Sequence, residues 1–282
     1  MRPRSLVLHF DDAYLDNYLF AAPILREFDA PATFFASTDF VTPGQAPRPL
    51  SNDPVDWRGY MNAAELREMD ADPLFDVEAH GTNHACVPVS GRRIDIATGQ
   101  NWRKYAPLSW ARIEGDKSMW YRAVDPPAVL SEGAAILEND SAFSGRWWRN
   151  GVVEGEAAFH ARVEQMLVTA HDGLAAILGR PPKVMAWPFD RCCAISIQAA
   201  RRVGFEAVTG GRGENRPGEA PDILSRVHMQ DYAFGGGPPQ LETLAARARA
   251  NGAAGRLPWH MLTAIAARMR RRRFGKPGYA VS

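Results

Sequence analysis

The stretch SLVLHFDDAYLDNYLFAAPILREFDAPATFFA, residues 5–36, decides the fold class of this chain. It opens with a short apolar run, residues 5–10, that ends abruptly in two aspartates. Apolar side chains then recur near the helical period of about 3.6 residues over 14–28, until Pro31 stops the pattern. A second apolar run covers 32–36. A strand, a helix and a second strand in this order predict a β-α-β unit with parallel strands and helices packed outside.

The same alternation continues along the chain. We expect a helix over residues 62–69, with Asn62 as its N-cap and Glu65 three residues later, and a strand over 74–79. Five of the eight tryptophans fall in residues 85–156, which fit no regular pattern, so we expect an insertion over one mouth of the fold. The remaining expected elements are a helix over 156–178, a strand over 183–186, a helix over 195–203, strands over 205–209 and 223–229, and a helical tail from 241 that Gly252 and Gly255 break in two.

Composition and charge divide the chain into a body and an appendage. The 282 residues are 46% hydrophobic and 23% charged, which is typical of a globular protein. The net charge of +1 argues against a bulk nucleic-acid binder, but residues 243–282 hold nine basic and no acidic residues, against 24 basic and 32 acidic before them. We expect one large α/β domain over 1–240 and a basic Ala/Arg-rich helical tail over 241–282.

The tail has two interpretations. A short amphipathic segment ends in the basic run Arg270–Arg273, and its apolar residues are Trp259, Met261, Leu262, Ile265 and Met269. It is expected either to rest on anionic lipid, where each basic residue contributes about 1 kcal/mol, or to be a solvated tail. Binding of nucleic acid is disfavoured because the basic residues lack interleaved aromatics apart from Phe274.

The location expected from the sequence is cytoplasmic, or peripheral at the inner face of the membrane. After the first four residues only Leu6, Val7 and Leu8 are apolar before His9, whereas a secretory signal needs roughly 7–15 apolar residues in a row. The three cysteines, Cys86, Cys192 and Cys193, make a poor disulfide framework, and they fit a reducing compartment.

Polar clusters follow three of the expected strands: Asp11 with Asp12, His80 with His84, and His228. The carboxyl ends of parallel strands converge on one face, where active sites are built. The adjacent carboxylates of Asp11 and Asp12 repel each other, and a bound cation or a proton would relieve the repulsion. The alternative to a cation site is that these aspartates cap the following helix. Two imidazoles and a carboxylate could form an open zinc site, whereas His80 and His84 could instead lie in a surface loop or pack in the core.

The motifs together resemble those of a known family. His9-Phe10-Asp11-Asp12 and Pro31-Ala32-Thr33-Phe34-Phe35 resemble the opening of the polysaccharide deacetylase family, the NodB-homology or carbohydrate esterase family 4 group. His80-Gly81-Thr82-Asn83-His84 is similar to its second motif. Ala186-Trp187-Pro188-Phe189 is similar to the third, in the form of exopolysaccharide deacetylases. The resemblance covers roughly residues 5–84 and 157–230.

This resemblance implies an α/β fold of the distorted (β/α) barrel type with a divalent metal, most often Zn²⁺, in its mouth. Asp12, His80 and His84 would be the metal ligands, and Asp11 the general base that activates the attacking water. The backbone N–H of Phe189 would stabilise the oxyanion, and His228 would protonate the leaving amine. The same ligand set also suits cobalt, nickel or iron.

Some positions depart from the family pattern. Ala186 stands where many members have an arginine that tethers the base, and Arg226 could supply that charge. His228 follows a stretch that only loosely resembles the fifth motif, so a structural histidine is the alternative. Trp187, Trp147 and Trp148 are candidate sugar platforms, with core or lid packing as the alternative. Trp187, Pro188, Phe189 and Arg226 form the expected substrate-binding set.

The function expected from these features is metal-dependent removal of N-acetyl groups from an amino-sugar glycan, either a polysaccharide or a lipid-linked saccharide. One alternative is a deformylase or another amide hydrolase on an amino sugar. The other is a carbohydrate-binding relative that keeps the fold and has lost turnover.

Overall fold

The computed structural model describes residues 7–49, 56–113, 115–120, 123–210, 218, 220–229 and 232–274. The chain forms two compact units, one over Leu6–Thr209 and one from Gly210 onward, and each is described by itself. The domain boundary expected at residue 240 stays a prediction. Lys276 of the basic tail lies outside the described residues.

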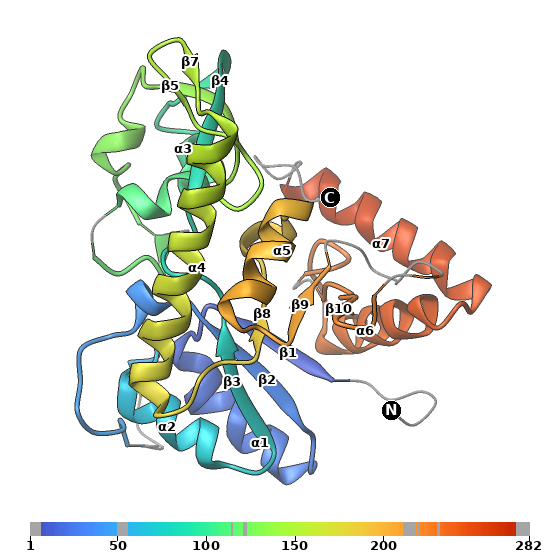
Figure 1. Ribbon diagram of the computed structural model, residues 1–282. Helices are drawn as coiled ribbons and strands as arrows, with labels where there is room; N and C mark the ends of the chain where they lie inside the picture. Colours follow the sequence, from blue (N-terminus) through green and yellow to red (C-terminus); the bar gives the residue numbers. More distant parts are fainter. Residues whose placement is uncertain are drawn as a thin grey trace. The chain divides into compact units, whose positions relative to one another are not determined.

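A parallel sheet forms the centre of the larger unit (Figure 1). Its strands are Leu8–Asp11 (β1), Ala32–Ala36 (β2), Phe75–Ala79 (β3), Val184–Met185 (β8) and Ala207–Thr209 (β9). They lie in the order β1-β2-β3-β8-β9, and every neighbouring pair is parallel. The sheet curls into half a barrel, so the predicted α/β fold of the NodB barrel type is confirmed.

Helices connect these strands, as the β-α-β pattern predicts. They are Asn17–Ala21 (η1, π-helical), Ala22–Glu27 (α1), Ala63–Ala71 (α2), Glu156–Leu178 (α4) and Ala194–Val203 (α5). The capping box predicted for α2 is present: the Asn62 side chain accepts from the backbone N–H of Glu65, whose carboxylate accepts from the Asn62 N–H. α4 ends at Gly179, whose φ of +76° suits glycine.

The first helix begins at Leu15, one residue later than the sequence predicts, and it is π-helical over Asn17–Ala21. Backbone hydrogen bonds tie its start to a distant segment: Leu15 N–H donates to Gly59 (3.0 Å), and Ala13 accepts from the Met61 N–H (2.8 Å). Tyr14, between them, pairs with Tyr60 in an isolated antiparallel bridge and so stays outside the helix. The helical pattern of apolar residues is therefore overridden locally by contact with a distant segment.

The core of this unit lies on both faces of the sheet. All five residues of β2 are buried, and the neighbours Phe34 and Phe35, which point to opposite faces, are both 0% exposed. Phe10 of β1 stacks on Phe34 with ring centroids 5.0 Å apart. A strand buried on both sides reads as a continuous apolar run, which explains why β2 shows no alternation.

The segment expected to be an insertion has its own regular structure. Its elements are Cys86–Ile96 (β4), Trp102–Tyr105 (α3), Ala106–Arg112 (η3, a 3-10 helix), Ala135–Ser141 (β5), Trp148–Arg149 (β6) and Val152–Val153 (β7). β4 pairs antiparallel with β5, and β6 with β7. Arg162 of α4 anchors the segment by donating to the carbonyls of Ala142 (2.7 Å) and Gly145 (2.9 Å) and pairing with Glu154 (2.8 Å).

The smaller unit contains a short strand and two helices. They are Ile223–Leu224 (β10), Pro239–Ala253 (α6) and Leu257–Phe274 (α7). The strand is shorter than predicted, whereas the two tail helices and the break between them are confirmed. Phe234 of the preceding loop, Ala245 of α6 and Ala266 of α7 form the buried contact between these helices. Among the helices that the structure describes, none has the length and apolarity needed to cross a membrane.

Candidate active site

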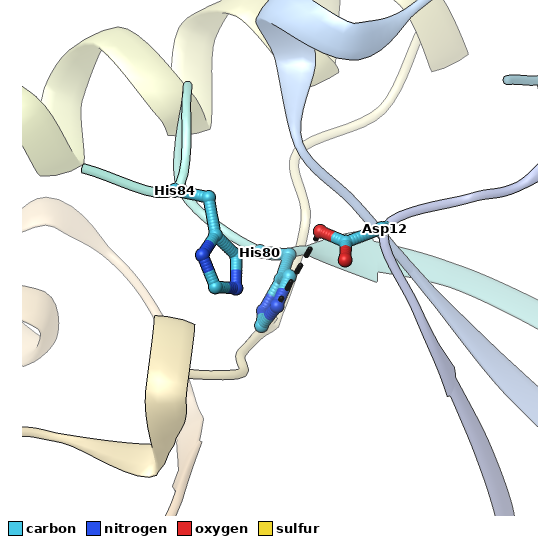
Figure 2. Close-up of side chains that lie close together, drawn as sticks. All are labelled: Asp12, His80 and His84. Carbon is cyan, nitrogen blue, oxygen red and sulfur yellow. Dashed lines mark ion pairs between the residues drawn. The ribbon is translucent and has the colours of Figure 1, made fainter. Parts of the chain in front are cut away.

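Three buried side chains meet at the carboxyl ends of β1 and β3 (Figure 2). Asp12 directly follows β1, His80 directly follows β3, and His84 lies in the loop between β3 and β4. One ligand atom from each lies within 4.8 Å of the others. The sheet therefore brings together the three residues that the family resemblance implies as metal ligands, because parallel strands end at a common edge.

The orientation of His80 follows from one hydrogen bond. Its Nδ1 lies 2.9 Å from the carbonyl oxygen of Ala186. A carbonyl oxygen can only accept, so in the neutral imidazole the proton is on Nδ1 and the lone pair is on Nε2. Nε2 faces the carboxylates, 3.7 Å from Asp12 Oδ1 and 4.0 Å from Asp11 Oδ2.

These separations fit a bound ion better than direct hydrogen bonds. Two tetrahedral ligands about 2.1 Å from a zinc ion are about 3.4 Å apart, close to the 3.7 Å between His80 Nε2 and Asp12 Oδ1. A hydrogen bond between such atoms would be about 2.7–3.2 Å long. The donor set, two imidazoles and one carboxylate, is also that of a catalytic zinc site.

His84 is the second imidazole of the cluster, and it is buried. Its Nδ1 has no hydrogen-bond partner among the described residues. Burial first, and then the neighbouring His80, lower the pKa of His84 well below its usual value. An unpaired buried polar atom costs about 1–3 kcal/mol, and a ligand at this position would offset that cost. A neutral, unpaired imidazole therefore fits a metal ligand.

Aromatic rings hold His84 on two sides. The Phe189 ring lies 4.1 Å from the His84 ring between centroids, and the Trp110 ring lies 5.0 Å from it. Phe189 comes from the turn Pro188–Asp190 after β8, whereas Trp110 comes from η3 in the insertion. One residue of the insertion thus forms a wall of the site, in agreement with its expected place over the mouth.

Ser37, at the end of β2, supports Asp12 from behind. Its side chain is fully buried, and Oγ lies 3.3 Å from Asp12 Oδ1 and 3.2 Å from the carbonyl oxygen of His80. One hydroxyl proton can serve one of these acceptors at a time. Sequence reasoning did not identify Ser37; the available signal was its position at the end of a strand between the two motif-bearing strands.

Asp11 and Asp12 have different surroundings, although they are adjacent in sequence. The Asp11 side chain is 32% exposed, whereas that of Asp12 is 9% exposed. The buried carboxylate sits among the histidines as a ligand would. The more exposed one can reach solvent water, which suits the general-base role that the family resemblance implies for Asp11. That role stays a prediction.

The backbone is strained at several positions around the cluster. Asp12, His84 and Phe189 have φ values of 68°, 53° and 61°, in the left-handed region. Ala13, where the family usually has glycine, has a φ of 54°. Left-handed conformations cost non-glycine residues on the order of 1–3 kcal/mol and concentrate at functional sites. Their gathering here is an independent indication that this edge of the sheet is the working site.

A cluster of aromatic residues adjoins the site, and sequence reasoning did not identify it. Tyr14 stacks on Tyr60 (5.0 Å), and Phe40 contacts both Tyr60 (4.9 Å) and Trp110 (6.0 Å) between ring centroids. Burial first, and then the charge of Asp12, raise the pKa of the Tyr60 phenol well above its usual value. The phenols therefore stay protonated and provide a neutral wall beside the carboxylate.

The predicted sugar platform at Trp187 needs correction. Its side chain is 0% exposed and packs against Phe143 with centroids 5.4 Å apart. A ring enclosed in the core presents no face to a sugar, so Trp187 is a core residue in this structure. Trp147 is half-buried under the guanidinium of Arg149, 3.3 Å from its ring centroid. This contact favours the alternative prediction for Trp147, which is packing within the protein rather than a sugar platform.

The other predicted residues fall into two groups. Pro188 is buried in the turn after β8, and Phe189 of the same turn contacts His84, while the oxyanion role of the Phe189 N–H stays a prediction. Arg226 and His228 lie in the smaller unit. Their assignments as substrate-binding residue and general acid stay predictions as well.

Comparison with known proteins supports the resemblance seen in the motifs. The model of the polysaccharide deacetylase family matches residues 1–111, which include Asp11, Asp12, His80 and His84. The match covers the regions of the first two motifs and leaves the rest of the chain outside it. No curated protein matches the sequence.

Two solved structures are similar over most of the chain. One is a de-N-acetylase from Aggregatibacter actinomycetemcomitans, with 20% identity, a TM-score of 0.53, and coverage of 79% of this chain and 70% of that one. The other is the BpsB deacetylase domain from Bordetella bronchiseptica, with 24% identity, a TM-score of 0.54, and coverage of 80% and 71%. At these identities the likeness establishes the fold.

Proposed function

We propose that this protein is a metal-dependent N-deacetylase that acts on an N-acetylated amino-sugar glycan. The observation that carries the proposal is the buried cluster of Asp12, His80 and His84, with ligand atoms within 4.8 Å of one another at the strand ends of a deacetylase-like fold. The family match over residues 1–111 supports the reaction class. The two structural relatives, a de-N-acetylase and a deacetylase domain, agree with that reaction class.

The ligands of the metal in this proposal are Asp12, His80 and His84. When bound, a divalent ion such as Zn²⁺ lowers the pKa of water toward about 7 and polarises an amide carbonyl. Ala186 fixes the His80 ring through its carbonyl, so that Nε2 presents its lone pair. Ser37 fixes the Asp12 carboxylate. Such supporting hydrogen bonds typically raise metal affinity or activity about 10–100-fold.

The reaction consumes one water for each acetyl group. Asp11 accepts a proton from the attacking water, whose oxygen forms a bond to the acetyl carbon. The Phe189 N–H donates to the developing oxyanion. The C–N bond then breaks, and the amine leaves with a proton that we assign to His228. The products are acetate and a free amino sugar.

The test combines metal analysis with a release assay. The purified chain is stripped of metal, reloaded with zinc, and assayed for acetate and formate on a panel of N-acylated sugars. We expect about one zinc per chain and acetate as the product. Asp11→Asn should keep its metal and lose about 10²–10⁴-fold in turnover.

Asp76→Asn is the matched control, because Asp76 is an exposed carboxylate on β3, and it should retain full activity. A full-rate Asp11→Asn enzyme would refute the mechanism. Formate as the main product would identify a deformylase. Bound metal without hydrolysis of any sugar would favour a carbohydrate-binding relative.

A further inference from the structure

Helix α7 carries a concentrated positive charge. Between Leu257 and Phe274 it contains five arginines, Arg268 and Arg270–Arg273, and no acidic residue. The last acidic residue of the whole chain is Glu242, in the first turn of α6. Within α7 no carboxylate can therefore neutralise these arginines.

One side of α7 is used for packing within its own unit. Ala266 is 6% exposed and meets Ala245 of α6, and Leu262 packs against the same cluster. Apolar residues on this side are thus accounted for by the contact between the two helices. This contact does not explain the apolar residues elsewhere on α7.

A second apolar set lies along the outer side of α7. Leu257, Met261, Ile265 and Met269 are 79%, 71%, 51% and 44% exposed. A spacing of four residues places them in one row along the helix surface. Such a continuous row, unlike scattered single residues, indicates an interaction surface. We call it the outer row.

Arg268 and Arg272 lie on the outer side of the helix, whereas Arg273 lies beside Gly235 of the preceding loop. Arg268 follows Ile265 by three residues, and Arg272 follows Arg268 by four, so both lie beside the outer row. Arg268, Arg271 and Arg272 are exposed. Their long aliphatic stems can lie along an apolar surface while the guanidinium groups reach outward. The outer side of α7 therefore combines apolar contact with a positive rim.

This combination fits the surface of an anionic bilayer. A helix lying in the interface buries its apolar residues among acyl chains and places basic residues at lipid phosphates. An acidic protein or a nucleic acid would neutralise the arginines but would leave the four apolar side chains in water. A neutral apolar partner would offer no complementary charge to Arg268, Arg271 and Arg272.

We infer that the outer side of α7 is a docking surface for anionic phospholipid, which holds the protein against a membrane in a peripheral mode. The inference is independent of the reaction proposed above. If the glycan is linked to a lipid carrier, the docking would bring the enzyme to its substrate. No step in the argument requires that link.

The test uses the full chain and sedimentation with vesicles. One set consists of phosphatidylcholine alone, and the other contains an equal part of phosphatidylglycerol. We expect binding to the anionic vesicles only. Raising the salt from about 0.1 M to about 1 M, which shortens the Debye length from about 10 Å to about 3 Å, should weaken that binding strongly.

Two variants separate the charged and apolar contributions. Arg268→Gln/Arg271→Gln/Arg272→Gln should weaken binding about 100-fold, since each basic residue is worth roughly fivefold near an anionic surface. Met261→Ser/Ile265→Ser should weaken it by on the order of tenfold or more. Both sets of residues are exposed, so folding, followed by circular dichroism, should be unchanged.

Matched controls change equivalent residues in other places. Arg67→Gln/Arg93→Gln/Arg247→Gln removes the same charge from other exposed sites, and Val124→Ser/Ile24→Ser removes apolar side chains that are 83% and 55% exposed. Both controls should bind like the unmodified chain. Equal losses in control and test variants would overturn the inference, as would equal binding to both vesicle types. Self-association or RNA binding that the α7 variants abolish, without any vesicle binding, would also overturn it.

Discussion

His80 and His84 are four residues apart, yet the protein holds their rings by different means. A backbone carbonyl of Ala186, more than a hundred residues away, orients His80. His84 has two aromatic walls and an unpaired Nδ1. A histidine oriented only by packing depends on the shape of its neighbours. The wall formed by Trp110 therefore matters for metal binding as well as for stability.

We predict that Trp110→Ala weakens zinc affinity about 10–100-fold, as loss of a supporting contact does at other metal sites. The free energy of unfolding of the variant should also fall, by about 3–5 kcal/mol. Trp102→Ala provides the comparison, because Trp102 is equally enclosed in the insertion (1% exposed) but has Arg103 over its ring. Zinc titration with a competing chelator measures the affinities. Equal zinc affinity in the two variants would contradict the role of Trp110.

At the scale of elements, α2 shows how a local sequence signal and a distant contact reinforce each other. Glu65 belongs to the capping box that the sequence predicts. The structure adds Arg48, whose Nε and Nη2 donate to the two Glu65 carboxylate oxygens at 2.8 and 2.6 Å. Glu65 is fully buried. Its burial raises the pKa, but Arg48 and the backbone donors outweigh that, so the pKa lies below its usual value.

This depressed pKa predicts a specific pH dependence of stability. The contribution of Glu65 is complete above its unfolded-state pKa of about 4.3 and is lost as the pH falls through the lower folded-state pKa. Glu65→Gln should be less stable at pH 7 by about 2 kcal/mol. The difference should shrink on acidification below about pH 4. Urea unfolding of both proteins across this range measures it; a constant difference would show that the charge is not responsible.

At the scale of the whole molecule, charge and chemistry occupy different parts of the chain. The candidate metal ligands all lie in the unit over Leu6–Thr209. The acid-free run of basic residues lies in the unit from Gly210 onward. Metal binding should therefore stabilise the first unit specifically, because a ligand that binds only the folded state shifts its unfolding equilibrium.

Removal and return of the metal should be visible in thermal unfolding. With zinc at about 100 times its dissociation constant the gain is about 2.7 kcal/mol, or roughly 5–10 °C in Tm for a unit of this size. His84→Ala should lose the zinc-dependent shift, and Asp76→Asn should keep it. Calorimetry with and without chelator makes the measurement. A shift of the same size in His84→Ala would place the stabilising metal elsewhere.

The sequence by itself determined the motifs and most elements outside the insertion, whereas the strands and helices within residues 85–156 were not visible in it. Apolar periodicity and turn residues act within a few positions, so β2, α4 and the break between α6 and α7 are visible in it. The shared position of Asp11-Asp12 and His80 at strand ends follows from parallel pairing alone. Packing is different, because it depends on segments that are far apart in sequence.

Only the tertiary structure decided which residues surround the motifs. It placed Ser37 behind Asp12, set Trp110 of the insertion against His84, and enclosed Trp187 in the core. It also put the outer row of α7 on the side that faces away from the contact with α6. No periodicity encodes such choices, since each depends on the shapes and polar groups of several distant segments packed together.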